Sequence, residues 1–185
     1  MAQKGFYYDM TACVGCKACY IACKDKNDLP LGVMYRNVYT FEGGRYPKPW
    51  IFNISISCNH CSDPRCVTNC PTGASYKREE DGLVLVDQEA CIGCQYCVWS
   101  CPYGARHYLE EQGVVGKCNG CVDLVERGQN PACVDACVMR ALEFGDLDEL
   151  KRRHPEAEVF TSWGAPGAEL TGPSMLVTLK PQARR

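Results

Sequence analysis

Short runs in which apolar and polar residues alternate recur along the chain, separated by turn-forming residues. Residues 51–57 alternate in the manner of a half-buried strand, and residues 83–87 form a second, mostly apolar run. The Asp81-Gly82 dipeptide stands just before this second run and is typical of a hairpin turn. We therefore expect a strand at 51–57 and a β-hairpin formed by residues 74–77 and 83–87.

The two ends of the chain also carry apolar runs. Residues 6–8 and 141–145 predict strands that can pair with each other, and a short strand is expected to begin at Met175 before a polar tail. Residues 31–50 predict one strand followed by a glycine- and proline-containing loop at 42–49. The aromatic residues of this segment indicate packing or a subunit interface.

Three helical segments are predicted between these strands. A helical turn at 19–26 ends at the breaker sequence Asn27-Asp28-Leu29-Pro30, and a second at 122–127 ends at Gly128. A third is expected at 146–154, with Asp146 as its N-cap. All of these elements are short, so loops make up much of the chain.

Composition is ordinary for a globular protein in all respects but one. The 185 residues are 46% hydrophobic and 23% charged, with a net charge of −2, and they allow one large or two small domains. This balance argues neither for nucleic acid nor for an anionic membrane surface as a partner, and we expect no nucleic-acid partner. No apolar run reaches 18 residues, so we expect no direct membrane span.

Sixteen cysteines are the exception. They fall into four quartets with none left over: Cys13, Cys16, Cys19, Cys23; Cys58, Cys61, Cys66, Cys70; Cys91, Cys94, Cys97, Cys101; and Cys118, Cys121, Cys133, Cys137. A disulfide scaffold is disfavoured because the N-terminus lacks the apolar core of a signal peptide and the cysteines form tight C-x2-C pairs. Such pairs are typical of metal ligands.

The third quartet has a diagnostic spacing. It reads C-x2-C-x2-C-x3-C-P from Cys91 to Pro102, the bacterial ferredoxin pattern for [4Fe–4S] clusters. Gly93 allows the backbone to curl so that N–H groups point at the sulfurs, and Pro102 redirects the chain. A structural zinc module also uses C-x2-C pairs and remains the alternative from another class, but it needs neither the third cysteine nor the proline.

The order of elements predicts an α+β fold of two nested ferredoxin-like units. Strand, quartet, hairpin, quartet and strand make residues 51–108 a complete two-cluster inner unit. The first and fourth quartets flank it, and residues 1–30 plus 109–150 are expected to form an outer two-cluster unit. Residues 31–50 are an insert, and residues 151–185 a C-terminal tail.

Seven segments together resemble one known family, the four-cluster iron–sulfur (beta) subunits of the molybdopterin oxidoreductases, and most of all the dimethyl sulfoxide reductase type. They are Cys13-Val-Gly-Cys-Lys-Ala-Cys19, Ser57-Cys-Asn-His-Cys61, Cys70-Pro-Thr-Gly-Ala74, Lys77-Arg-Glu-Glu-Asp-Gly82, Cys91-Ile-Gly-Cys94, Cys101-Pro-Tyr-Gly-Ala105 and Lys117-Cys-Asn-Gly-Cys121. The resemblance extends over residues 5 to about 150. Polysulfide, tetrathionate and formate enzymes use similar subunits.

This resemblance implies four [4Fe–4S] clusters with cross-ligation between paired quartets. The implied ligand sets are Cys13, Cys16, Cys19 and Cys137 for cluster 1; Cys118, Cys121, Cys133 and Cys23 for cluster 2; Cys58, Cys61, Cys66 and Cys101 for cluster 3; and Cys91, Cys94, Cys97 and Cys70 for cluster 4. In some relatives tryptophan replaces the second cysteine of the third quartet and leaves a three-iron cluster. Cys94 is present here, so four-iron clusters are expected throughout.

The function implied is electron transfer without catalysis. The chain would relay electrons between a quinol-oxidising integral membrane anchor and a molybdopterin (Mo or W bis-pterin) catalytic subunit of a respiratory reductase. The alternative within electron transfer is the iron–sulfur subunit of a formate dehydrogenase or hydrogenase complex. We expect membrane association through partner subunits, on the extracytoplasmic face by co-export with a twin-arginine partner; the alternative is the cytoplasmic face.

The remaining candidates lie beside the cysteines. His60 stands between Cys58 and Cys61 and is interpreted as a residue near its cluster or at the surface, and the sharper hypothesis puts it at a quinol pocket or subunit contact. Lys17, Lys24, Arg65 and Lys117 also neighbour the motifs. Their charges would raise cluster potentials, unless each is simply a solvated surface charge.

Overall fold

The structure of the chain is a computed structural model that describes residues 3–161 and 166–184. In chain order its elements are β1 (Lys4–Asp9), α1 (Ala18–Lys26), β2 (Arg36–Arg45), β3 (Lys48–Ser57), α2 (Arg65–Thr68), β4 (Ser75–Lys77), β5 (Val84–Val86), α3 (Tyr96–Trp99), β6 (His107–Leu109), β7 (Val114–Gly116), α4 (Val122–Val125), α5 (Ala132–Asp135), β8 (Leu142–Asp146), α6 (Leu147–Arg153), β9 (Glu158–Val159), η1 (Ala168–Leu170), β10 (Met175–Thr178) and η2 (Pro181–Ala183). It is a mixed α/β fold.

A four-stranded sheet brings the two ends of the chain together. Its order is β8-β1-β10-β9, so the first strand lies between two strands from the C-terminal part. β1 pairs antiparallel with β8, with Phe6 opposite Phe144, and this confirms the predicted pairing of residues 6–8 with 141–145. β1 also pairs parallel with β10, which puts the predicted C-terminal strand at Met175 in the core.

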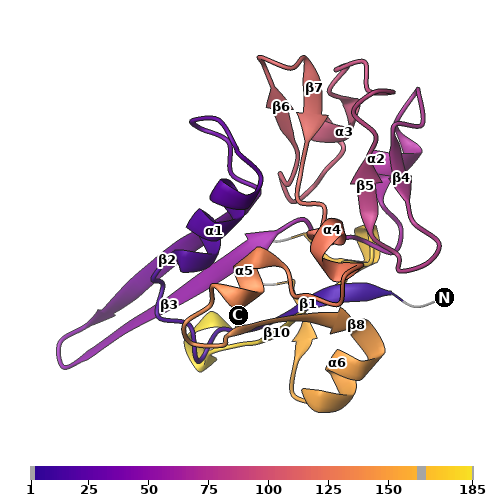
Figure 1. Cartoon of the computed structure of the whole chain (residues 1–185). Coiled ribbons are helices and arrows are strands. Elements are labelled where there is room, and N and C mark those ends of the chain that lie inside the picture. The colour runs from indigo at the N-terminus through magenta and orange to yellow at the C-terminus, as the bar shows by residue number, and fades with distance from the viewer. Residues whose placement is uncertain (1–2, 162–165, 185) are drawn as a thin grey trace.

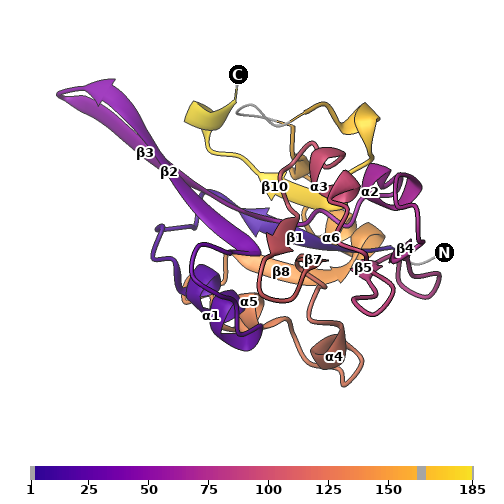
Figure 2. The ribbon, with the colours of Figure 1, turned by 90° about the horizontal axis from the view of Figure 1, so that it is seen from above.

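Three hairpins complete the strand content of the described residues. The predicted hairpin is confirmed as β4 and β5, which pair from Ser75 opposite Val86 to Lys77 opposite Val84. β6 and β7 form a second short hairpin directly after the third quartet. The third, β2–β3, is long and extends away from the sheet in both views (Figures 1 and 2).

The predicted loop at 42–49 is wrong, because pairing continues to Arg45 opposite Lys48 and leaves only the tip as a turn. Gly43 contributed to the loop prediction, but in the structure it lies within strand β2 and allows the opposite strand to pack closely. A Cβ at this position would clash with the ring of Trp50, the residue opposite it in the register. Glycine in a strand often marks such a close approach.

The three predicted helices are present as α1, α4 and α6 with slightly different bounds, whereas α2, α3 and α5 were not predicted. α1 begins one residue before the predicted 19–26, and α4 stops at Val125, shorter than the predicted 122–127. The N-cap of α6 is confirmed: the Asp146 carboxylate accepts hydrogen bonds from the N–H groups of Asp148 and Glu149 at 3.1 and 3.0 Å. In the described residues no helix is long and apolar enough to cross a membrane.

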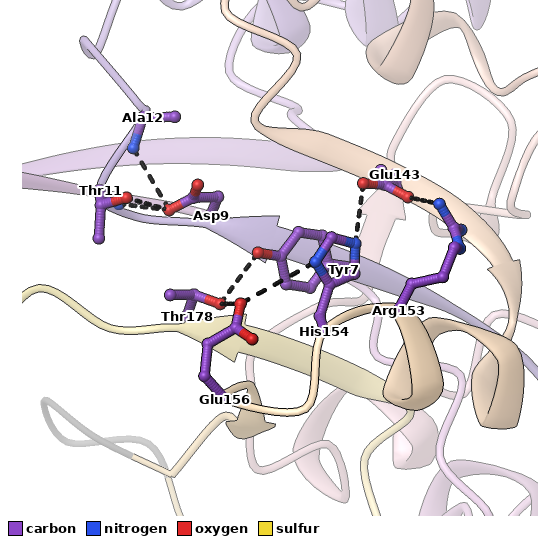
Figure 3. Close-up of polar contacts among 9 residues, drawn as sticks. All are labelled: Tyr7, Asp9, Thr11, Ala12, Glu143, Arg153, His154, Glu156 and Thr178. Atoms are coloured by element: carbon purple, nitrogen blue, oxygen red, sulfur yellow. Dashed lines mark hydrogen bonds and ion pairs between the residues drawn. The ribbon is translucent and has the colours of Figure 1, made fainter.

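α6 is held to one face of the sheet by a polar and aromatic cluster (Figure 3). The His154 ring, just past the helix, stacks on Tyr7 with centroids 3.6 Å apart, and its Nε2 lies 2.9 Å from Glu143 Oε1. Tyr7 faces α6, whereas Phe6 and Tyr8, its neighbours in β1, belong to the main core on the opposite face. α1, α4 and α5 lie on that opposite side in Figure 1, so β1 divides a small packing layer from the cysteine-bearing layer.

Candidate metal centres

All four quartets begin with the same unusual backbone. The residue before the second cysteine has a positive φ in each: +72° at Gly15, +43° at His60, +66° at Gly93 and +70° at Gly120. This left-handed conformation folds the loop tightly around the space between the first two sulfurs. The expectation for Gly93 is confirmed, since a Cβ there would also clash with the carbonyl oxygen of Gly113.

Backbone N–H groups point at cysteine sulfurs throughout, as the loop geometry predicts. Donors within 3.2 to 3.5 Å are found for six of the sulfurs: Gly15 for Cys13, Ser75 for Cys70, Val115 for Cys91, Ala105 for Cys101, Gly120 for Cys118 and Ala141 for Cys137. At Cys70, burial alone would raise the thiol pKa, but the N–H of Ser75 and the hydroxyl of Thr72 lower it. Such donors stabilise negative charge on sulfur.

The four cysteines expected to hold cluster 1 line one cavity. It is bounded by Cys13, Cys16, Cys19 and Cys137, and the space between the protein atoms there, open solvent included, is about 340 Å³. Tyr8, Val38, Ala141 and Leu142 make up much of the remaining wall. Three ligands come from the loop before α1 and its first turn, and the fourth follows α5, which packs against α1.

A second cavity collects the cysteines expected for cluster 4. Cys70, Cys91, Cys94 and Cys97 line about 310 Å³ of space, together with Val86 and Val115 from the two short hairpins. Cys70 belongs to the second quartet and the other three to the third, so the cavity joins two quartets.

The other eight cysteines can be grouped by which of them raise the thiol pKa of their neighbours. Burial first, and then the charges of Cys118, Cys133 and Cys121, raise the pKa of the Cys23 thiol. Burial, followed by the charges of Cys58, Cys66 and Cys101, raises the pKa of Cys61 to about 12, against a hydrogen bond from Thr171. These neighbours are the sets expected for clusters 2 and 3.

Each set lies beside the next. Burial raises the pKa of Cys19 from set 1, and the charge of Cys133 from set 2 raises it further. Burial and the charge of Cys58 from set 3 likewise raise the pKa of Cys118 from set 2 to about 12. Burial raises the pKa of Cys97 from set 4; Arg106 lowers it, and the charge of Cys66 from set 3 raises it. These charge effects act between sets 1 and 2, between sets 2 and 3, and between sets 3 and 4.

This donor chemistry fits iron–sulfur clusters. Each set supplies four thiols and at least one backbone N–H group aimed at a sulfur, and all of the cysteines except Cys16 are buried or partly buried. In residues 3–161 and 166–184, no three His, Cys, Asp or Glu side chains are arranged to hold a single metal ion. The sulfurs surround cavities, which suits a polynuclear cluster.

Two buried arginines near the sulfurs were not predicted. Arg36 and Arg106 are 1% and 3% exposed, and neither forms an ion pair with a carboxylate in the described residues. Of the cations that the sequence did indicate, Lys117 is buried and donates to the Val84 and Cys118 carbonyls. Lys24 donates to the carbonyls of Leu29 and Pro30, and Arg65 pairs with Asp63 at the surface.

His60 is fully buried, so the surface interpretation is wrong. Its Nδ1 accepts a hydrogen bond from the N–H of Val84 at 3.0 Å, while Nε2 has no partner in the described residues. Burial, and then the charges of Lys117 and Arg106, hold the pKa of His60 well below its usual value. The imidazole is neutral, with its proton on Nε2.

Comparison with known proteins agrees with this geometry. Residues 50–147 match a family described as a 4Fe-4S dicluster domain. The protein is 45% identical to an anaerobic dimethyl sulfoxide reductase chain of Escherichia coli, over 98% of its own length and 90% of that relative. It is 42% identical to a sulfite dehydrogenase subunit of Allochromatium vinosum (86% and 73% covered) and 44% identical to the thiosulfate reductase electron transfer subunit of Salmonella typhi (77% and 75%).

Proposed function

Because this protein is a member of the family of iron–sulfur electron-transfer subunits that includes the anaerobic dimethyl sulfoxide reductase chain of Escherichia coli, we propose that it carries four [4Fe–4S] clusters in a line. It is not itself the catalytic subunit. The clusters relay electrons between a quinol-reactive membrane anchor and a molybdopterin catalytic subunit of a respiratory reductase.

The proposed ligands are the four sets expected from the sequence, with Cys137 completing set 1, Cys23 set 2, Cys101 set 3 and Cys70 set 4. The two cavities lined by sets 1 and 4 are the observation that carries this proposal. In each of them a cysteine far along the chain joins three from one compact motif. The charge effects among the other eight cysteines support the same cross-ligation.

We also propose the nested arrangement of units. Packing of α1 against α5 supports an outer unit of residues 1–30 and 109–150, and packing of α2 against α3 supports an inner unit of residues 51–108. The hairpin of the insert, residues 31–50, and the strands of the tail, residues 151–185, are then additions to this ferredoxin-like pair.

A [4Fe–4S] cluster, when bound, gains and loses single electrons. The chain holds the sites, excludes water from them and points N–H groups at the sulfurs, which favours the more negative, reduced state. A domain of this length is about 40 Å wide by its expected radius of gyration. Four sites in the order 1 to 4 divide that distance into short steps.

The surfaces at both ends of this row support docking of two partners. Around set 1, Val14, Ile21 and Val138 are exposed, Val138 by 67%. Around set 4, Trp99 is 73% exposed and lies with its centroid 5.8 Å from that of Tyr96, also exposed. Apolar surface next to the terminal sites is expected where electrons enter and leave through other subunits. Membrane association would come from those partners, and we propose the extracytoplasmic face.

Metal analysis of anaerobically purified protein tests the proposal. We expect about sixteen iron and sixteen acid-labile sulfide per chain, four of each per cluster, and a brown colour that bleaches with dithionite. Stoichiometric zinc in place of iron, in protein that still supports electron transfer with its partners, would refute it.

A further inference from the structure

Arg36 is a buried cation that forms no ion pair with a carboxylate in the described part of the chain. It is the first residue of β2, and its Nη1 and Nη2 donate to the hydroxyls of Ser55 and Ser57 at 3.1 and 3.0 Å. Its guanidinium carbon lies 4.6 Å from the centre of the Phe6 ring, and Nε has no partner in the described residues. Two hydroxyls and an aromatic face do not offset the cost of burying an isolated charge.

The sulfurs around Arg36 belong to two different sets. Burial would lower the guanidinium pKa, but the charges of Cys133, Cys118, Cys19 and Cys23 raise it. Cys19 is a ligand of proposed cluster 1, and the other three belong to cluster 2. Ser55 Oγ, which accepts from Arg36 Nη1, also lies 3.5 Å from Cys19 Sγ. Arg36 is therefore next to the site of cluster 1 and within the field of the set 2 sulfurs.

Arg106 has the same position in the inner unit. Its Nη1 donates to Ser75 Oγ at 2.7 Å, while Nε and Nη2 have no partner in the described residues. Burial lowers its guanidinium pKa, and the charges of Cys66, Cys97 and Cys58 raise it. Cys58 and Cys66 belong to cluster 3 and Cys97 to cluster 4. Hydrogen bonds place Arg106 in the same way: its partner Ser75 donates its N–H to Cys70 Sγ of set 4, and the preceding residue, Ala105, donates its N–H to Cys101 Sγ of set 3.

Lys117, the third buried cation, differs in kind. Its ammonium group donates to two backbone carbonyls, so its hydrogen-bonding capacity is largely satisfied by the fold itself. In the described residues, by contrast, Nε of Arg36 and both Nε and Nη2 of Arg106 have no oxygen or nitrogen acceptor. An arginine side chain stays charged at every accessible pH.

We propose that Arg36 and Arg106 tune the reduction potentials of the clusters. Each holds a fixed positive charge between the two clusters of one unit and so raises the potentials of both. The proposal rests on the presence of the clusters. A positive charge between two anionic sites stabilises the reduced form of each and weakens their mutual repulsion. The effect of each arginine is thus confined to its own pair.

Redox titration of the four clusters by EPR tests this pairwise effect in the protein loaded with its clusters. Arg106→Gln should make reduction of clusters 3 and 4 at least tenfold less favourable, which lowers their potentials by about 59 mV or more for one electron. The potentials of clusters 1 and 2 should not change. Arg36→Gln should do the reverse. Arg106→Lys and Arg36→Lys keep the charge and should shift the potentials less.

A second route neutralises Arg106 without removing it. Ser75→Asp puts a carboxylate beside the guanidinium, and Ser75→Asn is the matched neutral control of the same size. The Asp variant should lower the potentials of clusters 3 and 4 relative to the Asn variant. Clusters 3 and 4 could instead be lost in Arg106→Gln and Ser75→Asp but kept in Arg106→Lys and Ser75→Asn. That result would show that the positive charge is needed for both clusters to bind, which also supports the proposal.

Three results would overturn the proposal. In the first, the reduction equilibria of the two clusters beside the replaced arginine change by less than a factor of two. In the second, the potentials of all four clusters shift equally; in the third, the Gln and Lys variants lose the same clusters to the same extent. Iron and sulfide analysis of the parent protein is read first. Fewer than four clusters there would contradict the proposed function, independently of the arginines.

Discussion

His60 Nδ1 accepts a hydrogen bond from the N–H of Val84 at 3.0 Å, which joins the loop of the second quartet to strand β5. The same residue has a left-handed backbone, and its carbonyl accepts a hydrogen bond from Ser174 at 3.0 Å. Non-glycine residues adopt this conformation at a cost, and persist in it only where surrounding contacts fix them.

Replacing His60 by alanine should destabilise the inner unit. The change leaves the buried Val84 N–H without an acceptor and opens a cavity, which together cost about 2–4 kcal/mol. We expect cluster bleaching in guanidinium chloride to be at least about tenfold faster, which corresponds to roughly 1.4 kcal/mol. His107→Ala, at a partly buried stacking residue, is the control and should change the rate less. Equal rates in the two variants would show that the Val84 contact is unimportant.

Cys137→Ser tests cross-ligation in the outer unit. Cys137 lines the cavity of Cys13, Cys16 and Cys19, although its own quartet contains Cys118, Cys121 and Cys133. We expect loss or change of cluster 1, up to about four of sixteen irons, with cluster 2 intact. Site-resolved EPR distinguishes them. A change in cluster 2 with cluster 1 intact would contradict the nested pairing.

Cys94→Trp tests the order of the wire. Tryptophan supplies no thiolate and fills the ligand's space in the cavity of set 4. One iron should be lost, leaving about fifteen per chain, with a three-iron EPR signal and a raised potential. In the assembled complex, turnover driven by quinol should stop, since the next transfer becomes uphill by a factor of ten for each 59 mV or so.

A soluble dye that reduces the catalytic subunit directly is the control for Cys94→Trp, and turnover driven by it should survive. Loss of both activities would indicate failed assembly. Persistence of both would show that cluster 4 is not on the path.

His154→Ala should weaken α6 without touching the clusters. It removes the ring stacked on Tyr7 and the contact with Glu143, together worth about 1–2 kcal/mol. Because α6 lies on the sheet face away from the cysteine motifs, iron content and potentials should match the parent (Figure 1). Faster hydrogen exchange confined to residues 147–153 would be the expected signature. Altered potentials would mean that the two layers are coupled.

Local signals in the sequence were sufficient for much of the site. Cysteine spacing, the Asp81-Gly82 turn and the Asp146 cap depend on neighbouring residues, and the structure contains each of them. The position of His60 was also readable, since it stands where the other three quartets have glycine. Comparison of the quartets with one another would have indicated a strained, buried residue.

The arginines could not be predicted in this way. Arg106 follows Cys101-Pro-Tyr-Gly-Ala105 just as Ser75 follows Cys70-Pro-Thr-Gly-Ala74, and these two equivalent residues meet in space through the 2.7 Å hydrogen bond. Nothing within either motif says that one member is a buried cation. Burial of a charge depends on sulfurs distant in sequence, and Arg36 comes from the insert, which carried no sign of ligand chemistry.

The place of β1 between β8 and β10 constrains the timing of the protein's biosynthesis. β1 has no partner strand until residue 142 has been made, and no second partner until residue 175 has been made. The inner cysteines are complete once Cys101 has emerged, whereas Cys13, Cys16 and Cys19 must wait for Cys137. The sites of the inner unit can therefore be filled before those of the outer unit, whose ligands are complete only after Cys137 has been made.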